Sequence, residues 1–146
     1  PVQPLTVGIW NDNEELNRCI ADNSDIITFH VYANAETTLS TIRRMKQYNR
    51  PVICTEWMNR VQGSTIKDCL HVFADENVGC MLWGLVNGKS QAHLRWGHRP
   101  EHLPYTGVWQ HDIYKNTNHR PYDPEELELL STTIEQKKYE GLSKTY

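Results

Sequence analysis

The 146-residue chain is long enough for one domain, and with 38% hydrophobic and 23% charged residues it has the composition of an ordinary globular protein. Its 15 basic residues against 18 acidic ones give a net charge of −3, so electrostatics offers no reason to expect a nucleic-acid partner. No apolar run approaches the length of about 18 residues that a membrane span needs, so we expect no membrane-spanning segment.

Short apolar, β-prone runs alternate with segments of helical spacing. We expect strands at residues 5–10, 25–32, 51–57 and 78–85, which are rich in β-branched and aromatic side chains. Between them, apolar residues recur three and four positions apart, which predicts three amphipathic helices. The predicted N-caps are Asp12 for the first helix and Ser64 for the third, and the predicted buried positions are Leu16, Cys19 and Ile20, then Leu39, Ile42, Met45 and Tyr48, then Ile66, Cys69, Leu70 and Phe73.

A long connection, residues 86–122, follows the fourth strand and is rich in His and Trp. The last helix has a clear start, since Asp123 as N-cap, Pro124 at the first position and Glu126 at the third form an acidic version of the capping box. Residues 137–146 are expected to be a frayed polar tail. The side chains of this helix that we expect to face inward are Leu127, Leu130 and Ile134.

This order of elements predicts an α/β fold with a parallel sheet, because continuous apolar strands alternating with amphipathic helices are typical of sheets covered by helices. If the sheet curls into a barrel, right-handed crossovers place every helix on its outer side. Residues such as Ile9, Phe29, Ile53 and Leu82 are then expected to face the barrel core.

The four cysteines, Cys19, Cys54, Cys69 and Cys80, match no zinc-binding spacing, and the sequence predicts neither a metal nor another cofactor. Cys54 and Cys80 fall in apolar runs, where a free thiol behaves as a small hydrophobic side chain. We expect four reduced, structural cysteines, and spacing alone leaves a bridge between any two of them open.

Functional residues of a parallel barrel lie at the C-terminal ends of its strands. Indole rings offer flat faces for the C–H groups of sugars, so a carboxylate among tryptophans suits a carbohydrate site. Each residue also has a simpler interpretation, as rim packing for a tryptophan, an ion pair for a glutamate or a backbone contact for a histidine. Composition and spacing leave these interpretations balanced. The strand ends carry Trp10, His30, Tyr32, Glu56, Trp57 and Trp83.

Three segments, residues 24–32, 50–58 and 83–89, resemble strands six, seven and eight of retaining clan-A glycoside hydrolases. That clan has the (β/α)₈ fold and includes cellulases, mannanases, xylanases and β-glycosidases. Residues 109–113 and 121–126 also resemble bacterial cellulase- or xylanase-like members. The resemblance covers nearly the whole chain and implies the last four βα units, strands five to eight, of a TIM barrel.

Carried over residue by residue, the resemblance makes Glu56 the catalytic nucleophile. Tyr32 and His30 correspond to positions near that nucleophile, and Trp83 corresponds to the tryptophan that forms a floor for the sugar. The expected substrate-binding set is completed by Trp10 and, in the loop after the fourth strand, by Lys89 and Gln91.

The resemblance assigns no residue of this chain as the second catalytic carboxyl group. Retaining hydrolysis uses two carboxyl groups about 5–5.5 Å apart, and the family takes its acid/base from an Asn-Glu pair at strand four. No such pair stands at a strand end here, and a complete barrel usually needs about 250 residues. We therefore expect residues 1–146 to be a half-barrel that pairs with the N-terminal half of the same barrel or with itself. A barrel of two copies would place Trp83 where the acid/base belongs.

The resulting hypothesis is retaining hydrolysis of β-linked glycosides in plant-type polysaccharides or oligosaccharides, in a secreted or periplasmic enzyme. The proton donor would come from the missing half, so the isolated chain is not expected to hydrolyse glycosides at enzyme-like rates. Efficient turnover by the isolated chain would point to Asp112 or Glu101 as proton donor. The alternatives are a non-catalytic half-barrel that binds carbohydrate through its tryptophans, and a different α/β protein in which Glu56 is only structural.

Overall fold

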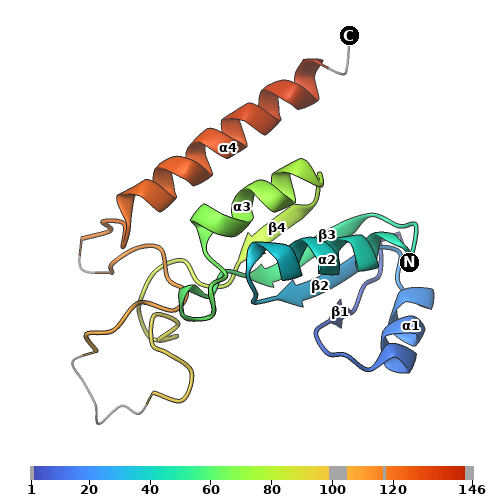
Figure 1. Cartoon of the computed structure of the whole chain (residues 1–146), viewed down its shortest axis with the longest axis horizontal. Helices are drawn as coiled ribbons and strands as arrows, with labels where there is room; N and C mark the ends of the chain where they lie inside the picture. The colour runs from blue at the N-terminus through green and yellow to red at the C-terminus, as the bar shows by residue number, and fades with distance from the viewer. Residues whose placement is uncertain (1, 99–104, 117, 144–146) are drawn as a thin grey trace.

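The computed structural model describes residues 2–98, 105–116 and 118–143. Within them, strands and helices alternate along the chain, so the predicted α/β class is confirmed (Figure 1). The elements are β1 (Gly8–Ile9), α1 (Glu14–Asp22), β2 (Ile27–Val31), α2 (Ala35–Lys46), β3 (Val52–Trp57), a short 3₁₀ turn (Arg60–Gln62), α3 (Ile66–Asp75), β4 (Gly79–Leu82) and α4 (Pro124–Ser143).

The four strands form one parallel sheet in the order β1-β2-β3-β4, as the sequence predicts. The paired strands are shorter than the apolar runs that predict them. At the start of the chain, Leu5 lies beside Asp25 and exchanges hydrogen bonds with its backbone N–H and its carboxylate. Only Gly8 and Ile9 then pair with β2, so the first predicted strand is reduced to two residues.

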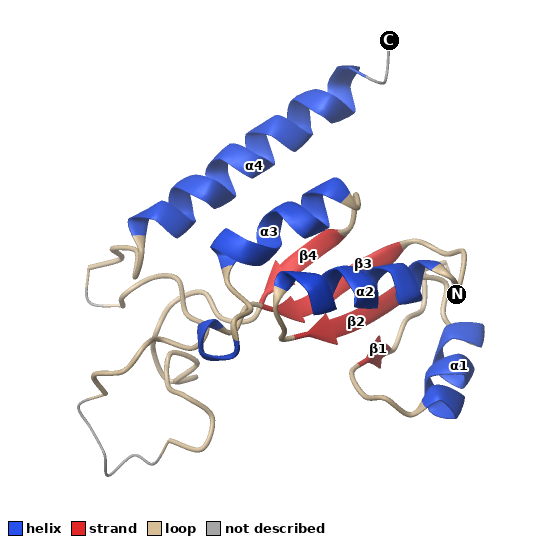
Figure 2. Cartoon of the chain, viewed as in Figure 1, coloured by secondary structure: helices blue, strands red, loops and turns tan. Residues whose placement is uncertain are grey.

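α2 and α3 lie over one face of the sheet (Figure 2). The register aligns Ile9 with Phe29 and Trp57 with Leu82, and this set packs toward the helices, with Ile9 and Phe29 almost fully buried. Ile53 belongs to the opposite face, in line with Thr28 and Gly79. The expectation that Ile9, Phe29 and Leu82 face a barrel core is therefore wrong. Alternate residues of a strand face opposite sides of the sheet. When consecutive positions are all apolar, the sequence does not show which alternate set faces the helices.

Two helices begin one residue later than the sequence predicts. The cap of α1 is Asn13 rather than Asp12, and the cap of α3 is Thr65 rather than Ser64, each accepting a backbone N–H of the first turn. Ser64 is buried and exchanges two backbone hydrogen bonds with Asn59, which hold it outside the helix. The hydroxyl of the next residue is therefore the one placed over the helix N-terminus.

The predicted buried stripes of α2 and α3 are confirmed, with Leu39 and Tyr48 only partly buried at the margin of the core. Of the stripe predicted for α1, only Ile20 packs against the core, because Leu16 and Cys19 are exposed and the buried residues are Asn17 and Ala21. α1 covers the edge of the sheet at its shortest strand, and Asn17 turns inward to donate its amide N–H to the carbonyl of Asn11.

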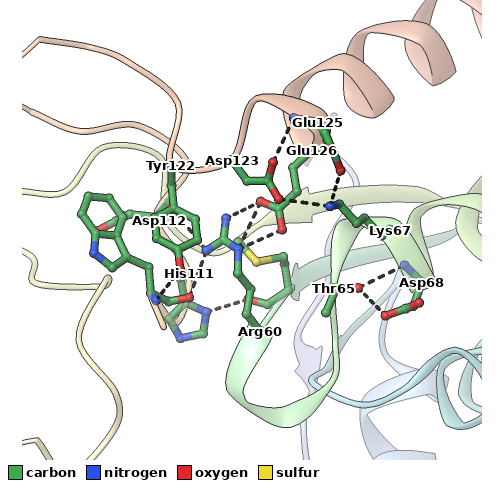
Figure 3. Close-up of polar contacts among 12 residues, drawn as sticks. Arg60, Thr65, Lys67, Asp68, His111, Asp112, Tyr122, Asp123, Glu125 and Glu126 are labelled. Carbon is green, nitrogen blue, oxygen red and sulfur yellow. Dashed lines mark hydrogen bonds and ion pairs between the residues drawn. The ribbon is translucent and has the colours of Figure 1, made fainter. Parts of the chain in front are cut away.

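The long connection between β4 and α4 lies beyond the C-terminal ends of the strands, toward which the arrowheads in Figure 1 point. It is held there by Arg60, whose guanidinium donates to Glu126 in α4 and to the carbonyls of Trp109 and Asp112 (Figure 3). Arg60 also lies over the ring of Tyr122, 4.7 Å from its centroid. One buried cation thus joins the turn after β3, the connection and the last helix.

The start and end of α4 differ from the prediction. Asp123 accepts the N–H of Glu125, but Glu126 pairs with Arg60 instead of closing a capping box. Leu127 and Leu130 are partly buried, whereas Ile134 is 64% exposed although it lines the same hollow beside Leu82. The helix continues to Ser143, so the segment from residue 137 is helical rather than a frayed tail, and residues 144–146 lie outside the described residues.

All four cysteines are free, as expected, and Cys54 and Cys69 are buried in the core. In the portion of the chain that the structure describes, no helix has the length and apolar character needed to cross a membrane.

Candidate functional site

Glu56 lies near the C-terminal end of β3, between β2 and β4 in the sheet. The register between β2 and β3 shifts after Phe29, so that Thr55 is an extra residue and Glu56 stands opposite His30. Its carboxylate is partly exposed, with 22% of the side chain accessible. A bulge of this kind re-aims a side chain at the end of a strand.

His30 and Tyr32 both reach the same oxygen of Glu56. The hydroxyl of Tyr32 donates a hydrogen bond to Oε2 across 2.9 Å. Nδ1 of His30 lies 3.3 Å from Oε2. Neither contact involves Oε1. The structure therefore brings together three of the residues that the sequence nominates.

The ring of His30 extends from Glu56 toward β1. A Cβ atom added to Gly8 would lie 3.3 Å from Nε2 of His30, so the imidazole fits closely over this glycine. His30 thus spans the sheet from β3 to β1 on the face opposite α2 and α3. A side chain at position 8 would press on the ring and shift it.

Tyr32 is held by aromatic neighbours as well as by Glu56. Its ring lies 5.2 Å from Trp96 in a T-shaped arrangement and 5.5 Å from His111. Burial is the main cause that raises the pKa of Tyr32 far above its usual value, and the hydrogen bond to Glu56 raises this pKa further. The phenol therefore stays protonated and able to donate to the carboxylate throughout the neutral range.

His111 is buried and makes a hydrogen bond through each ring nitrogen. Nδ1 lies 2.7 Å from the carbonyl oxygen of Met58, which can only accept, so Nδ1 carries a proton and donates it. Nε2 then accepts from the side-chain amide of Gln110, whose Oε1 accepts the backbone N–H of Trp96. Burial lowers the pKa of His111, which keeps the ring neutral.

Met58 has a positive φ of 73° although it is not a glycine, and it is fully buried. This backbone conformation is uncommon for a side chain of its size. It follows directly after β3 and aims the Met58 carbonyl at His111. The turn after β3 therefore places a backbone carbonyl where it binds His111 of the long connection.

Of the other predicted residues, Trp83 follows β4 and donates its backbone N–H to the carbonyl of Trp57, which places it beside the end of β3. Trp83 and Gln91 line one cleft together with Trp96 and His111. Lys89 is exposed and does not line this cleft. Trp10 is also exposed and lines a separate, smaller hollow at the end of β2 that His30 and Tyr32 share.

Asp112 does not lie in the exposed part of the site. Its side chain is fully buried, burial raises its pKa, and neither carboxylate oxygen has a hydrogen-bond partner among the described residues. Nδ1 of His93 lies 3.7 Å from Oδ2, and Gly84 packs so closely that an added Cβ would be 2.8 Å from Oδ1. Enclosure makes Asp112 a poor proton donor for a glycan, and Glu101 lies outside the described residues.

Sequence reasoning missed Trp96, Gln110 and His111 as parts of the site. Gln110 and His111 stand in a stretch that carries the family resemblance, but nothing in their spacing shows that they contact Tyr32 or Trp96. Across the described ranges, no group of three or more His, Cys, Asp or Glu side chains is arranged to hold a metal ion. The chain matches no protein-family model, no curated protein and no solved structure.

Proposed function

We propose that the chain is the C-terminal half of a (β/α)₈-barrel glycoside hydrolase that acts on β-linked glycans with retention of configuration, and that Glu56 is its nucleophile. The observation that carries the proposal is the way the carboxylate is held. Oε2 receives the Tyr32 hydroxyl and faces Nδ1 of His30, whereas Oε1 takes part in neither contact. A carboxylate restrained through one oxygen keeps the other in position to attack.

The proposed reaction has two steps. Oε1 of Glu56 attacks the anomeric carbon, the glycosidic C–O bond breaks, and the leaving oxygen keeps the electron pair and takes a proton from the acid/base. Water then attacks the same carbon, gives its proton to the acid/base, and releases the Glu56 carboxylate from the glycosyl ester. Tyr32 would stabilise the carboxylate charge in both the free and the departing state by donating to Oε2.

The acid/base is proposed to come from outside residues 1–146. Within the described ranges, the side chain of Glu56 contacts Tyr32 and His30, and no hydrogen bond joins it to a second carboxyl group. A completing half-barrel, either the N-terminal half of the same barrel or a second copy, would pair with the outer edges of β1 and β4. Met81 and Leu85, in and after β4, are more than half exposed and fit such a contact. The resemblance further favours plant-type polysaccharides as substrates and a secreted or periplasmic enzyme.

A second candidate function is carbohydrate binding without catalysis. The lack of an Asn-Glu pair at a strand end favours it, because a nucleophile alone must expel an unprotonated leaving group. The exposed Trp83 and Trp96 beside the site would serve either function.

Leaving-group dependence tests the proposal and separates the two candidates. A 2,4-dinitrophenolate leaves without a proton, whereas a methoxide needs general acid help worth about 10²- to 10⁴-fold. We expect the 146-residue chain to release dinitrophenolate from 2,4-dinitrophenyl β-glycosides and to leave methyl β-glycosides intact. Glu56→Gln should abolish the release, and Glu128→Gln, on an exposed position of α4, should not. Release that persists in Glu56→Gln would overturn the assignment, and no release by the folded chain would favour the binding function.

A further inference from the structure

The long connection forms a cleft of about 310 Å³ that neither the nucleophile nor its two partners line. Its walls include two indole rings, a primary amide and a hydroxyl, and its volume is near the lower end of the range of about 300–1,000 Å³ for small-molecule sites. The side chains that matter below are Trp83, Ser90, Gln91, Trp96 and His111.

Trp96 is fixed on one side and open on the other. Its ring contacts Tyr32 at 5.2 Å and His111 at 5.3 Å, and its backbone N–H donates to Gln110. It is nevertheless 53% exposed. An indole that is anchored along one side and uncovered along the other is preorganised to stack on a flat ligand, because little side-chain freedom remains to be lost on binding.

The cleft lies next to the proposed nucleophile. Tyr32 separates the two, since its hydroxyl contacts Glu56 while its ring contacts Trp96. A ligand on Trp96 would therefore lie one aromatic ring away from the carboxylate. Trp83 also lies near Glu56 along the chain backbone, because its N–H donates to the carbonyl of Trp57, the residue that follows Glu56.

The lining carries no formal charge. None of the described residues that line the cleft is Asp, Glu, Lys or Arg. Burial lowers the pKa of His111 and keeps that ring neutral. Lys89 and Arg95 are exposed neighbours along the chain, but they do not line the cleft. A carboxylate or sulfate group would lose its hydration there without gaining a cation.

Resting on the proposed function, we propose that this cleft is a subsite for a neutral pyranose ring next to the ring that Glu56 attacks. The C–H face of the sugar stacks on Trp96 and Trp83, and its hydroxyls bond the amide of Gln91 and the hydroxyl of Ser90. The cleft selects neutral β-glycans over uronic-acid polymers, because it offers aromatic faces and uncharged hydrogen-bonding groups.

Calorimetric titration of the 146-residue chain with neutral oligosaccharides, such as cello-, manno- and xylo-oligosaccharides, and with galacturonate oligosaccharides tests this assignment. At least one neutral series should bind, and the galacturonate series should bind at least about 10-fold more weakly. Trp96→Ala should weaken neutral binding by about 10-fold or more, the scale of losing an aromatic anchor. Trp96→Phe should restore most of it. Tyr139→Ala removes an exposed aromatic side chain of α4 outside the cleft and should bind as the unaltered chain does.

Gln91→Gly provides a second test that does not depend on whether the tryptophan variants fold correctly. Gln91 has a φ of 53°, which glycine adopts freely, so this change removes the amide and keeps the backbone conformation. We expect it to weaken neutral binding several-fold. Binding that is unchanged in both Trp96→Ala and Gln91→Gly, equal affinity for galacturonate, or no binding at all by the folded chain overturns the subsite.

The outcome separates this inference from the proposed function. If Trp96→Ala loses sugar binding and Glu56 does not react, the sugar subsite is supported and the assignment of Glu56 as nucleophile is wrong. Covalent reaction at Glu56 with binding independent of Trp96 would do the reverse.

Discussion

Tyr32 donates its hydroxyl to Oε2 of Glu56 across 2.9 Å, from the residue after β2 to the end of β3. The contact exists because adjacent parallel strands end at one edge of the sheet. The shifted register brings Glu56 opposite His30 and leaves Tyr32 beyond the strand. Two residues 24 positions apart thus form one unit, in which a protonated phenol fixes a carboxylate.

Tyr32→Phe should slow any reaction of the Glu56 carboxylate with an activated glycoside. The change removes a hydrogen bond to a charged group, which is worth about 1.5–3 kcal/mol and corresponds to roughly 10- to 100-fold in rate. The aromatic contacts with Trp96 and His111 remain, so the melting temperature should change little. Dinitrophenolate release and a thermal melt measure the two effects. An unchanged rate would show that the contact has no part in the chemistry.

Arg60→Met should destabilise the chain strongly. Arg60 and Glu126 form an ion pair in which both side chains are about 95% buried, at 6% and 5% exposed. Removing one partner of a buried pair costs about 3–5 kcal/mol, because the other charge stays buried and unpaired. Lys67→Met is the matched control, since its ion pairs with Glu125 and Asp123 are exposed to solvent and contribute little to stability. Urea unfolding measures both. Equal losses would mean that the Arg60 pair does not hold the connection.

Gly84→Ala should disturb the connection far more than Gly88→Ala. Gly84 has a φ of 108°, and a Cβ there would lie 2.8 Å from Oδ1 of Asp112. At Gly88 the nearest atom to a new Cβ is 3.9 Å away. We expect Gly84→Ala to lower the melting temperature and Gly88→Ala to leave it almost unchanged. Similar melting curves for the two variants would place Asp112 elsewhere than against Gly84.

The stability of the chain should fall as the pH drops below the ordinary histidine pKa. The pKa of His111 is lowered by burial, so the unfolded chain binds the proton more tightly than the folded chain does. Its contribution is present above about pH 6.5, the unfolded pKa, and is lost as the pH falls toward the lower folded value. His111→Asn keeps an N–H directed at the Met58 carbonyl and cannot titrate. Melting temperatures between pH 7.5 and 5 should therefore fall less steeply in this variant; parallel curves would contradict the assignment.

The α/β class and the order of the parallel strands were predictable because apolar runs and helical spacing alternate clearly. The lengths of the strands were not. Leu5 belongs to a β-prone run, yet it bonds to Asp25 outside the regular ladder, and this depends on where the chain turns after α1. The face of the sheet that packs against the helices could not be predicted either. Phe29 and Thr28 are both buried although they point to opposite sides of the sheet.

The site was predictable as far as strand ends determine it. Glu56, His30 and Tyr32 follow directly from the rule that parallel strands present their C-terminal ends together. Trp96 and His111 come from a connection without repeating secondary structure, so no periodicity reports their place. The pairing of Glu126 with Arg60 could not be predicted either, because it joins segments far apart in the sequence. A capping box is a local pattern, and it was overridden by Arg60, 66 residues away.

Covalent labelling is the most direct test of whether Glu56 acts as a nucleophile. A 2,4-dinitrophenyl 2-deoxy-2-fluoro-β-glycoside loses its leaving group without a proton donor, and the fluorine slows hydrolysis of the ester that forms. Incubation of the 146-residue chain with the gluco, manno and xylo forms, followed by proteolysis and peptide mass measurement, locates any adduct. We expect one glycosyl ester on Glu56, no adduct in Glu56→Gln and slower formation of the ester in Tyr32→Phe. A folded chain that gains no adduct, or gains one on another residue while Glu56→Gln reacts equally well, would contradict this expectation.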